Sequence, residues 1–365
     1  MDKIKIGIIG VGNCASSLLQ GIQYYKEHGE ISGIMHQDIG GYKPSDIEIR
    51  LAFDVDSRKV NKNINEAIFA LPNCTKSICT KMPQSDVYVK MGKVLDGCAP
   101  HMLADSPNTF CLSNEKQPDV NEVVSLIKET GVDMLINYLP VGSQKATEFY
   151  AECALEAGVG FINNIPVFIA SDETWEKRFA DKNIPIIGDD TKSQFGATIL
   201  HRTLMEICRK RGVEITKSYQ LNVGGNSDFL NMLDRSRLIS KKISKTEAVQ
   251  SIGKISNYKE NLHVGPSDHV PFLKDNKLCF IRIEGTIWGD LPIEMDIKLS
   301  VEDSANSAGV VIDVIRCCKL ALNNGIGGAL PEVSAYYCKH PKEQIADSIA
   351  YERVESFIKR LSHVS

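Results

Sequence analysis

Three short segments of the sequence gather charged and polar side chains that could act on a small molecule. Residues 187–194 place two carboxylates, an ammonium group and a hydroxyl directly after an apolar run: Asp189, Asp190, Lys192 and Ser193. Residues 240–245 carry three lysines, and residues 222–228 combine glycines with Asn226 and Asp228. Lysines near carboxylates can neutralise a phosphate or stabilise an enolate as charge develops. A lysine run alone would more simply be a solvated helix face, but here several such segments occur together.

A glycine-containing segment near the N-terminus predicts a dinucleotide site. Residues 10–15 read G-V-G-N-C-A, which fits G-x-G-x-x-A, and they lie between an apolar run and a helical pattern. In that context glycines let the backbone approach a pyrophosphate, and the amide groups of the helix N-terminus bind it. The predicted cofactor-binding residues of this loop are Gly10, Gly12, Asn13, Cys14 and Ala15. The alternative is an ordinary tight turn.

Two carboxylates follow the next predicted strand. Asp54 and Asp56 come directly after the apolar run at 48–53, where a carboxylate can bind a ribose diol. A carboxylate repels the 2′-phosphate of NADP, so this pair favours NAD. The connection before the strand, residues 28–47, is long, and the acidic residues therefore come later than the usual fingerprint expects.

Alternating strand and helix patterns must position these residues, and such alternation is typical of a parallel α/β sheet. The predicted strands and helices of the first half are residues 3–9, 16–27, 48–53, 120–129, 134–138, 143–157, 160–163 and 185–188. Ligands bind at the carboxyl ends of parallel strands. One crevice is therefore expected to be lined by Asp54, Pro140, Asn163, Asn164 and Asp189.

The second half of the chain has a different sequence pattern. A predicted helix from Phe195 to Arg211 is followed by segments in which apolar and polar residues alternate, such as 278–285 and 293–301, and these predict an antiparallel sheet with one covered face. The lysine- and serine-rich stretch 236–261 suggests a mobile lid that holds a helix around 245–252, and the helical pattern at 307–323 is expected to pack back onto the first sheet. We therefore predict a split Rossmann domain with an inserted α+β domain: residues 1–194 with 306–365, and residues 195–305.

The composition narrows the class of protein. The chain has 365 residues, enough for two domains, with 42 basic and 46 acidic side chains. This near-neutral balance provides no global field that would recruit nucleic acid or a membrane. The 11 cysteines match neither a zinc site nor a redox pair, and no apolar run reaches the length of a membrane span. We expect a cytoplasmic protein with reduced thiols.

Ordered motifs run through nearly the whole chain. They are GVGNCASSL (10–18), FDVD (53–56), YLPVGS (138–143), PVFIASD (166–172), GDDTKSQFGAT (188–198), LNVGGNSDFLNML (221–233), SKKISK (240–245), GPSDHV (265–270) and EDSANSAGVVID (302–313). In this order they closely resemble the inositol-1-phosphate synthase family, also called inositol-3-phosphate synthase, in its short prokaryotic form.

The resemblance implies an isomerase that converts D-glucose 6-phosphate to 1D-myo-inositol 3-phosphate, the first step of inositol and inositol-phospholipid biosynthesis. In this reaction tightly held NAD+ oxidises C5 of the open-chain sugar, and enolisation at C6 gives a nucleophile that attacks the C1 aldehyde. The NADH formed at the outset then reduces the C5 ketone, so there is no net redox change. An enolate and a phosphate dianion in one site need several cations, and lysine can also exchange a proton when burial lowers its pKa.

The resemblance also implies residue roles. Lys192, Lys241 and Lys339 match family lysines that act as proton shuttles and as phosphate or oxyanion partners, and Asp190 and Asp303 complete the catalytic set. The implied substrate-binding residues are Asn226, Lys245 and Arg202. The implied cofactor-binding residues beyond the glycine loop are Asp54, Asp56, Tyr138, Leu139, Pro140, Tyr150, Ser193 and Asp228.

The chain departs from longer eukaryotic members, which carry a second lysine where this sequence has Gln194 followed by Phe195. Phosphate contact is then expected to pass to Arg202. Family members differ in whether a divalent or monovalent cation assists. In this chain the ligand-type residues His263, Asp268 and His269 have no recognised metal spacing, and we interpret them as structural. The resemblance further implies a homotetramer built through the inserted domain.

Two other interpretations stay open. The first is a net NAD-dependent dehydrogenase of a sugar phosphate or an amino-acid semialdehyde, which would accumulate NADH. The second is an NAD-sensing protein without catalysis, which would keep the glycine loop but would have no use for Lys192, Lys241 and Lys339 together.

Overall fold

The strands of the computed structural model, which describes residues 2–29, 33–79, 81–104, 107–253 and 255–362, form two separate sheets. Within these residues the first sheet has seven strands in the order β11-β6-β5-β4-β1-β2-β3, and every neighbouring pair is parallel. The strand order reverses between β1 and β4, which marks the edge where α/β proteins bind ligands. The bounds are Ile4–Ile9 (β1), Ile47–Asp54 (β2), Lys90–Met91 (β3), Met134–Asn137 (β4), Gly160–Asn163 (β5), Pro185–Ile187 (β6) and Gly328–Ala329 (β11).

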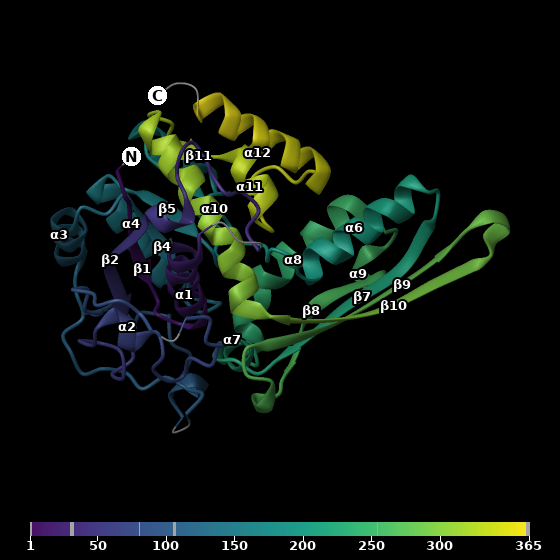
Figure 1. Cartoon of the computed structure of the whole chain (residues 1–365). Coiled ribbons are helices and arrows are strands. Elements are labelled where there is room, and N and C mark those ends of the chain that lie inside the picture. Colours follow the sequence, from purple (N-terminus) through teal and green to yellow (C-terminus); the bar gives the residue numbers. More distant parts are fainter. Residues whose placement is uncertain (1, 30–32, 80, 105–106, 254, 363–365) are drawn as a thin grey trace.

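Helices cover both faces of this sheet (Figure 1). One face packs Ile4, Ile6 and Ile8 against α1 and the C-terminal helices, while Leu135 and Phe161 face the opposite helices. Strands buried on both sides are expected to be almost entirely apolar, which is why β1 is apolar apart from Lys5. The helices of the two faces are α1 (Asn13–His28), α10 (Asp303–Asn323), α11 (Pro331–Tyr337) and α12 (Asp347–Ser362), and α3 (Val120–Thr130), α4 (Gln144–Ala157) and α5 (Glu173–Asp181).

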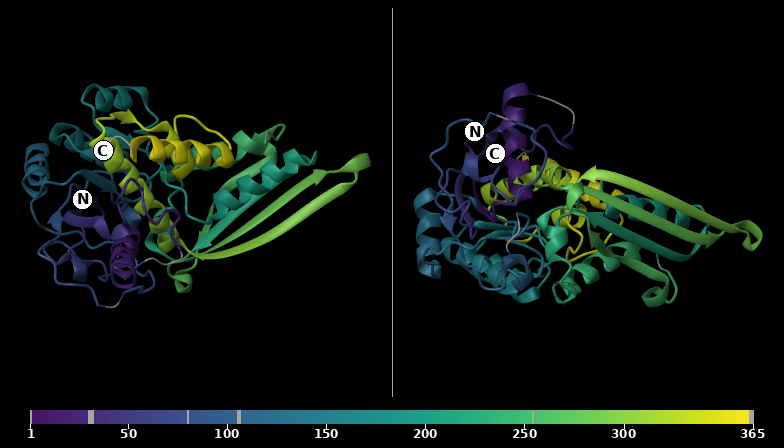
Figure 2. Two further views of the ribbon diagram at one scale, coloured as in Figure 1. Left: turned by 45° about the horizontal axis from the view of Figure 1, so that its top comes forward. Right: turned by 90° about the horizontal axis from the view of Figure 1, so that it is seen from below.

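The second sheet extends away from the first (Figure 2) and has the order β10-β9-β7-β8. Its inward side chains, Cys279, Ile281 and Ile283, pack against α6 and α8. The predicted antiparallel sheet is in fact mixed, because β7 and β8 are parallel and α8 forms the crossover between them. The bounds are Ala197–Lys210 (α6), Glu214–Gly224 (β7), Ile239–Gly253 (α8), Leu262–His269 (β8), Asn276–Thr286 (β9) and Pro292–Glu302 (β10).

The segment predicted as a mobile lid is instead largely a packed helix. Ala248 and Val249 of α8 are fully buried, and Val249 packs in the core beneath the second sheet. The prediction placed its helix at 245–252, whereas α8 begins earlier, at Ile239, and so brings the lysines of residues 240–245 onto one rigid element. The remaining short helices are α2 (Ile64–Ala67), α7 (Ser227–Asn231), α9 (Tyr258–Asn261) and 3-10 turns at Pro44–Asp46, Pro100–Leu103, Arg235–Leu238, Pro271–Leu273 and Trp288–Asp290.

The chain returns to the first sheet through α10, which begins at Asp303 and packs against β1, β5 and β6. The predicted parallel Rossmann-type sheet with an inserted second sheet is confirmed. The proposed boundaries at 194/195 and 305/306 stay predictions; they lie between β6 and α6 and in the first turn of α10. Across the described residues, none of the helices combines the length and the apolar character that a bilayer crossing requires.

Candidate functional site

A pocket lies at the carboxyl ends of the central strands and reaches from the glycine loop to the second sheet. Gly10, Gly12 and Asp54 line one end, and Asp190, Lys241 and Lys339 line the other. The site thus joins two segments far apart in the sequence, because β1 ends beside β4 and α10 brings the C-terminal part back to the same edge.

The glycine loop has the backbone geometry that a dinucleotide needs. Gly10 has a φ of 89°, and a Cβ atom there would lie 2.8 Å from the carbonyl oxygen of Tyr138. Gly12 caps α1 without a side-chain hydrogen bond, and a Cβ atom at this position would meet nothing within 4 Å. Among the described residues, the backbone N–H groups of Asn13 and Cys14 have no protein acceptor. Free amides at a helix N-terminus bind a pyrophosphate.

Asp54 shapes this loop through its carboxylate. The Val11 amide donates to Oδ2 at 2.7 Å, and the amides of Val55 and Asp56 donate to Oδ1 at 2.7 and 2.9 Å. Lys59 also stabilises the loop, because its Nζ donates a hydrogen bond to the Val11 carbonyl at 2.8 Å. Asp54 still lines the pocket, where a ribose diol can reach it.

Two buried polar atoms also fit a bound polar group. The hydroxyl of Tyr138 and the amide nitrogen of Asn164 have no hydrogen-bond partner among the described residues, although both side chains line the pocket. Buried polar atoms without partners are rare in native proteins, and ligand-binding sites are one reason for them. Together with the loop geometry, these atoms fit a dinucleotide.

Some predicted cofactor residues lie elsewhere. Asp56 is 1% exposed, and Arg58 Nε donates to its carboxylate at 2.8 Å, so it braces a loop instead of facing the pocket. Ala15 is fully buried in α1, which suits the close helix packing required at this motif position. The predicted cofactor-binding residues that do line the pocket are Gly10, Gly12, Asn13, Cys14, Asp54, Tyr138, Leu139, Pro140, Tyr150, Ser193 and Asp228.

The predicted crevice is likewise only partly correct. Asn163 and Asp189 are fully buried, and Asn163 Nδ2 donates to Asp189 Oδ1 at 2.7 Å. Asp189 also accepts hydrogen bonds from the amides of Ile169 and Ala170 at 3.0 and 3.1 Å. These two side chains therefore hold the strand ends and their loops together, whereas Asn164 and Pro140 line the pocket.

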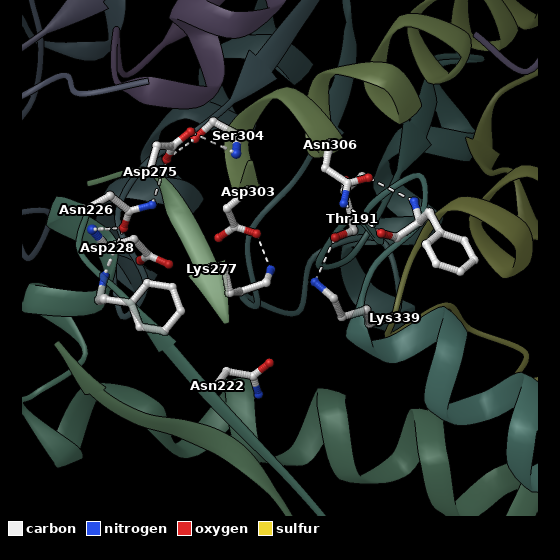
Figure 3. A network of polar contacts seen from close by, with 12 residues as sticks. Thr191, Asn222, Asn226, Asp228, Asp275, Lys277, Asp303, Ser304, Asn306 and Lys339 are labelled. Carbon is white, nitrogen blue, oxygen red and sulfur yellow. Dashed lines mark hydrogen bonds and ion pairs between the residues drawn. The ribbon is translucent and has the colours of Figure 1, made fainter. Parts of the chain in front are cut away.

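The other end of the pocket holds pairs of lysine and aspartate. Lys339 Nζ donates to Asp190 Oδ1 and to the Thr191 carbonyl, both at 2.7 Å. Lys241 Nζ donates to Asp228 Oδ2 at 3.0 Å. Lys277 pairs with Asp303 at the start of α10, and Figure 3 shows this pair between Asp275 and Lys339. Lys245 also lines the pocket, one helical turn after Lys241, but its ammonium has no hydrogen-bond partner within the described chain.

This arrangement separates the pKa values of the charged groups. Burial lowers the pKa of Lys245 to about 7, and the neighbouring charges of Lys241, Lys339 and Lys277 act in the same direction. Burial alone would raise the pKa of Asp190, but Lys339 and Lys241 bring it below its ordinary value. A pocket in which one lysine titrates near neutrality beside other ammonium groups can both bind an anion and accept a proton.

Comparison with known proteins identifies the family. The chain is 49% identical to the inositol-3-phosphate synthase of Mycolicibacterium smegmatis over 366 residues, covering 98% of each chain. It is 47% identical to the enzyme of the same name from Corynebacterium glutamicum, covering 97% of this chain and 98% of that one. The family model described as myo-inositol-1-phosphate synthase matches residues 196–304. This chain belongs to the inositol-3-phosphate synthase family.

A solved structure supports the fold of the family. The chain is similar to a myo-inositol-1-phosphate synthase-related protein from Thermotoga maritima, with a TM-score of 0.82, 24% sequence identity and coverage of 98% of both chains. At this level of identity the similarity concerns the arrangement of the two sheets alone.

Two residues predicted for the substrate end do not line the pocket, Lys192 of the GDDTKSQ motif and Arg202, whereas the other predicted catalytic and substrate-binding residues do. Lys192 is 2% exposed, and its Nζ donates to Asp347 Oδ1 at 2.7 Å and to the Ala335 carbonyl at 2.9 Å. Arg202 Nε donates to Asp347 Oδ2 at 2.6 Å, and its Nη2 donates to the Ile345 carbonyl at 2.6 Å. Neither cation lines the pocket; through these contacts Asp347 connects α12 to α6 and to the segment that follows β6.

Lys277 is one of the pocket residues that the sequence analysis missed. It ends the polar run Lys-Asp-Asn-Lys at residues 274–277, which the sequence analysis did not consider, and the period of β9 also marks it. Lys277 lies on the same face of β9 as Cys279, Ile281 and Ile283, which are buried. The charged side chain therefore occurs on an otherwise apolar face of the strand. A charged side chain on the buried face of a strand is a signal that could have identified it.

The residues considered for a metal are scattered. His263 and Asp268 are exposed, and His269 Nε2 lies 3.2 Å from the Gly225 carbonyl. In the part of the chain that is described, no three His, Cys, Asp or Glu side chains form a group able to hold a metal ion.

Replacing Gly10 by alanine is expected to weaken NAD binding at least 10-fold, because a left-handed residue costs about 1–2 kcal/mol and the methyl group would clash with Tyr138. Titration calorimetry with NAD+ measures the effect. Gly131→Ala is a matched control, since Gly131 also has a positive φ, of 62°, but has open space around it at the end of α3. Equal loss in both variants would mean that strain alone is responsible.

Replacing Asp347 by alanine is expected to destabilise the protein by about 3 kcal/mol, because it leaves the buried cations of Lys192 and Arg202 without their shared carboxylate. Urea unfolding measures this. The exposed pair of Lys177 and Asp181 is the control, and Asp181→Ala is expected to cost less than about 0.5 kcal/mol. An equally small effect in both variants would contradict the structural role of Asp347.

Proposed function

We propose that this protein is an NAD-dependent inositol-3-phosphate synthase that converts D-glucose 6-phosphate to 1D-myo-inositol 3-phosphate without net redox change. The observation that carries the proposal is one pocket that joins a dinucleotide-type glycine loop to the buried Asp190 and to four lysines at the opposite end, which are Lys241, Lys245, Lys277 and Lys339. Full-length relatives at 47–49% identity bear the synthase name. A simple dehydrogenase would have little use for so many ammonium groups.

The cofactor end would be held by residues with free donors or open approach. The pyrophosphate would lie against the amides of Asn13 and Cys14, and the ribose diol near Asp54. When bound, NAD+ supplies a hydride acceptor for C5 and returns the hydride at the end of the turnover. Burial raises the pKa of the Cys14 thiol to about 12, so Cys14 stays protonated and contributes packing and its amide, not a nucleophile.

Three of the lysines would bind and stabilise negative charge. Lys241, Lys277 and Lys339 each pair with a carboxylate, which fixes the position of the ammonium group before the substrate enters. Burial would lower the pKa of Lys241, but Asp228 and Asp190 raise it above its ordinary value, so this lysine stays charged. Positioned cations of this kind suit a phosphate dianion and the oxygen of an enolate at C5.

Lys245 has the properties of the proton-transfer group. Its ammonium is buried and repelled by the three neighbouring lysines, so that near neutral pH about half of it is the free amine. An amine with a pKa near the working pH is an efficient general base. We assign Lys245 the removal of the proton at C6, and the charged lysines the stabilisation of the enolate that this removal creates.

The redox balance tests the proposal. Purified protein is incubated with glucose 6-phosphate and a catalytic amount of NAD+, and inositol phosphate and NADH are measured in parallel. Formation of inositol phosphate without accumulation of NADH is the expected result. Stoichiometric NADH would instead indicate the alternative, a net dehydrogenase of a sugar phosphate. Lys241, Lys277 and Lys339 already supply positive charge for the phosphate, so we expect activity to persist after a divalent or monovalent cation is removed.

We also propose a cytoplasmic homotetramer assembled through the second sheet. The face of this sheet opposite α6 and α8 carries an apolar set: Tyr219, Leu221, Val223, Leu278 and Phe280. Phe280 is 38% exposed in the single chain, and covering such a face is a common reason for association. A monomeric mass in light scattering at working concentration would contradict the tetramer.

A further inference from the structure

A buried carboxylate beside the pocket has no role in the proposed reaction. Asp275 lies just before β9, is 1% exposed and does not line the pocket. Its Oδ1 accepts hydrogen bonds from Asn226 Nδ2 and from the Ser304 hydroxyl, both at 2.9 Å. Its Oδ2 accepts the Ser304 amide at 3.2 Å, as Figure 3 shows. Burying a carboxylate is costly, and three donors on two oxygens compensate for that cost.

The donors belong to the segments that carry two of the lysine–aspartate pairs. Asn226 caps α7, because its Oδ1 accepts the amides of Asp228 and Phe229 at 3.1 and 3.2 Å, and Asp228 is the partner of Lys241. Ser304 directly follows Asp303, the partner of Lys277.

The backbone of Asp275 makes the same connection. The Asp303 amide donates to the Asp275 carbonyl at 3.0 Å, so both the side chain and the backbone of Asp275 hold the first turn of α10. Lys277 lies two residues after Asp275 on β9. One residue therefore joins the start of α7, the start of β9 and the start of α10, which carry Asp228, Lys277 and Asp303; the fourth member of the two pairs, Lys241, lies on α8.

We infer that Asp275 is a positioning residue that keeps the Asp228–Lys241 and Asp303–Lys277 pairs in register with each other, and through them sets the geometry of the enolisation step. The inference rests on the proposed synthase function. Asp275 acts through Asn226 and Ser304 and does not touch the substrate. A misplacement of about 1 Å at a reacting centre can lower a rate roughly 100-fold, so a residue behind the pocket wall can control turnover.

The charge of Asp275 makes this role testable by pH. The titratable groups around it are Asp303 on α10, the thiols of Cys14 and Cys74, and the adjacent Lys274. Burial and the charge of Asp303 raise the pKa of Asp275 to about 6. Below that pH the carboxyl gains a proton and loses one of its acceptor positions. Asp275→Asn imitates this form, since an amide keeps one oxygen but presents N–H groups to the Ser304 amide.

The experiment compares kcat for inositol phosphate formation in the NAD-loaded wild type and in Asp275→Asn from about pH 5 to about pH 8. We expect the variant to be ~10- to 100-fold slower at pH 8, with NAD affinity within about 3-fold of the wild type, and the difference to shrink toward pH 5. Titration of Lys245 affects both proteins alike and cancels in the ratio. A ratio that is constant with pH, or near 1 throughout, overturns the positioning role.

Two further measurements complete the test. Asp172→Asn is the control for the same substitution outside the pocket. Asp172 is exposed, precedes α5 and accepts the amides of Thr174 and Trp175; the kcat of this variant should be unchanged. If Asp275→Asn does not fold, Ser304→Ala and Asn226→Ala carry the test, and their combined loss in kcat should be smaller than the product of the single losses. Independent, multiplicative losses overturn the inference. A wild type that forms no inositol phosphate contradicts the proposed function instead.

Discussion

Replacing Lys245 by methionine is expected to lower kcat for inositol phosphate formation ~100- to 10,000-fold, the contribution typical of general acid–base catalysis, while making the fold more stable. Activity falls because the free amine that accepts the C6 proton is removed. Stability rises because methionine fills the same space without placing a fourth positive charge beside Lys241, Lys277 and Lys339. A coupled assay and thermal unfolding of the same preparation measure both effects.

The pH dependence of the stability gain distinguishes this explanation from simple repacking. In the unfolded chain a lysine has a pKa of about 10.4, whereas that of Lys245 in the folded protein is about 7. Between these values the unfolded state binds more protons, so this group makes the wild type more stable as pH rises. Below pH 7 the full cost of the buried charge is present. The gain in Lys245→Met should therefore be largest near pH 6 and fade toward pH 10.

A control variant distinguishes the pH-dependent stability gain of Lys245→Met from the general effect of replacing a lysine. Lys177 is exposed and pairs with Asp181 one turn later on α5. Lys177→Met should leave kcat unchanged. Any change in its melting temperature should be the same at every pH, because water screens an exposed charge. A gain in Lys245→Met that is the same at pH 6 and pH 9 would contradict a buried charge at this position.

The parallel sheet was readable from the sequence because both of its faces are buried. Mostly apolar runs such as Ile4–Ile9 and Gly160–Asn163 favour buried strands, and the glycine motif identifies which strand is β1. The second sheet was less readable. Its alternating strands do not reveal that β7 and β8 are parallel, since that depends on the crossover through α8, whose apolar face is interrupted by lysines and serines.

Site residues could be predicted where a sequence motif coincides with the end of a strand. They were missed or misplaced where the direction of the side chain depends on packing between distant segments. Asp190 and Lys192 are two positions apart, yet Asp190 lines the pocket and Lys192 pairs with Asp347. The partner is 155 residues away in the chain, so local sequence could not indicate which way Lys192 points. Asp275 and Lys277 act through α10 in the same long-range manner.

Lys277→Met is expected to lower kcat by about 1000-fold, the upper range for loss of one charge-stabilising donor in an active site, with NAD affinity retained. Lys277 lines the pocket with Lys241, Lys245 and Lys339 and is not one of the residues expected to hold the cofactor, so its loss removes stabilisation of the enolate or phosphate and leaves NAD binding in place. Asp303 would also lose its cation, and substrate carrying negative charge would then meet an uncompensated carboxylate. Steady-state kinetics with glucose 6-phosphate and calorimetry with NAD+ measure the two outcomes.

Lys192→Met is the discriminating partner of this variant, because both lysines are largely buried and each is paired with an aspartate. In this variant Asp347 would still pair with Arg202, so its carboxylate would not be left without a cation. The lysines that line the pocket would not be changed. We expect a kcat within about 10-fold of the wild type, together with a loss of stability of about 1–2 kcal/mol. If Lys192→Met instead lost activity as severely as Lys277→Met while remaining folded, the motif lysine would have to reach the substrate during turnover, and α12 would have to release Asp347 for it to do so.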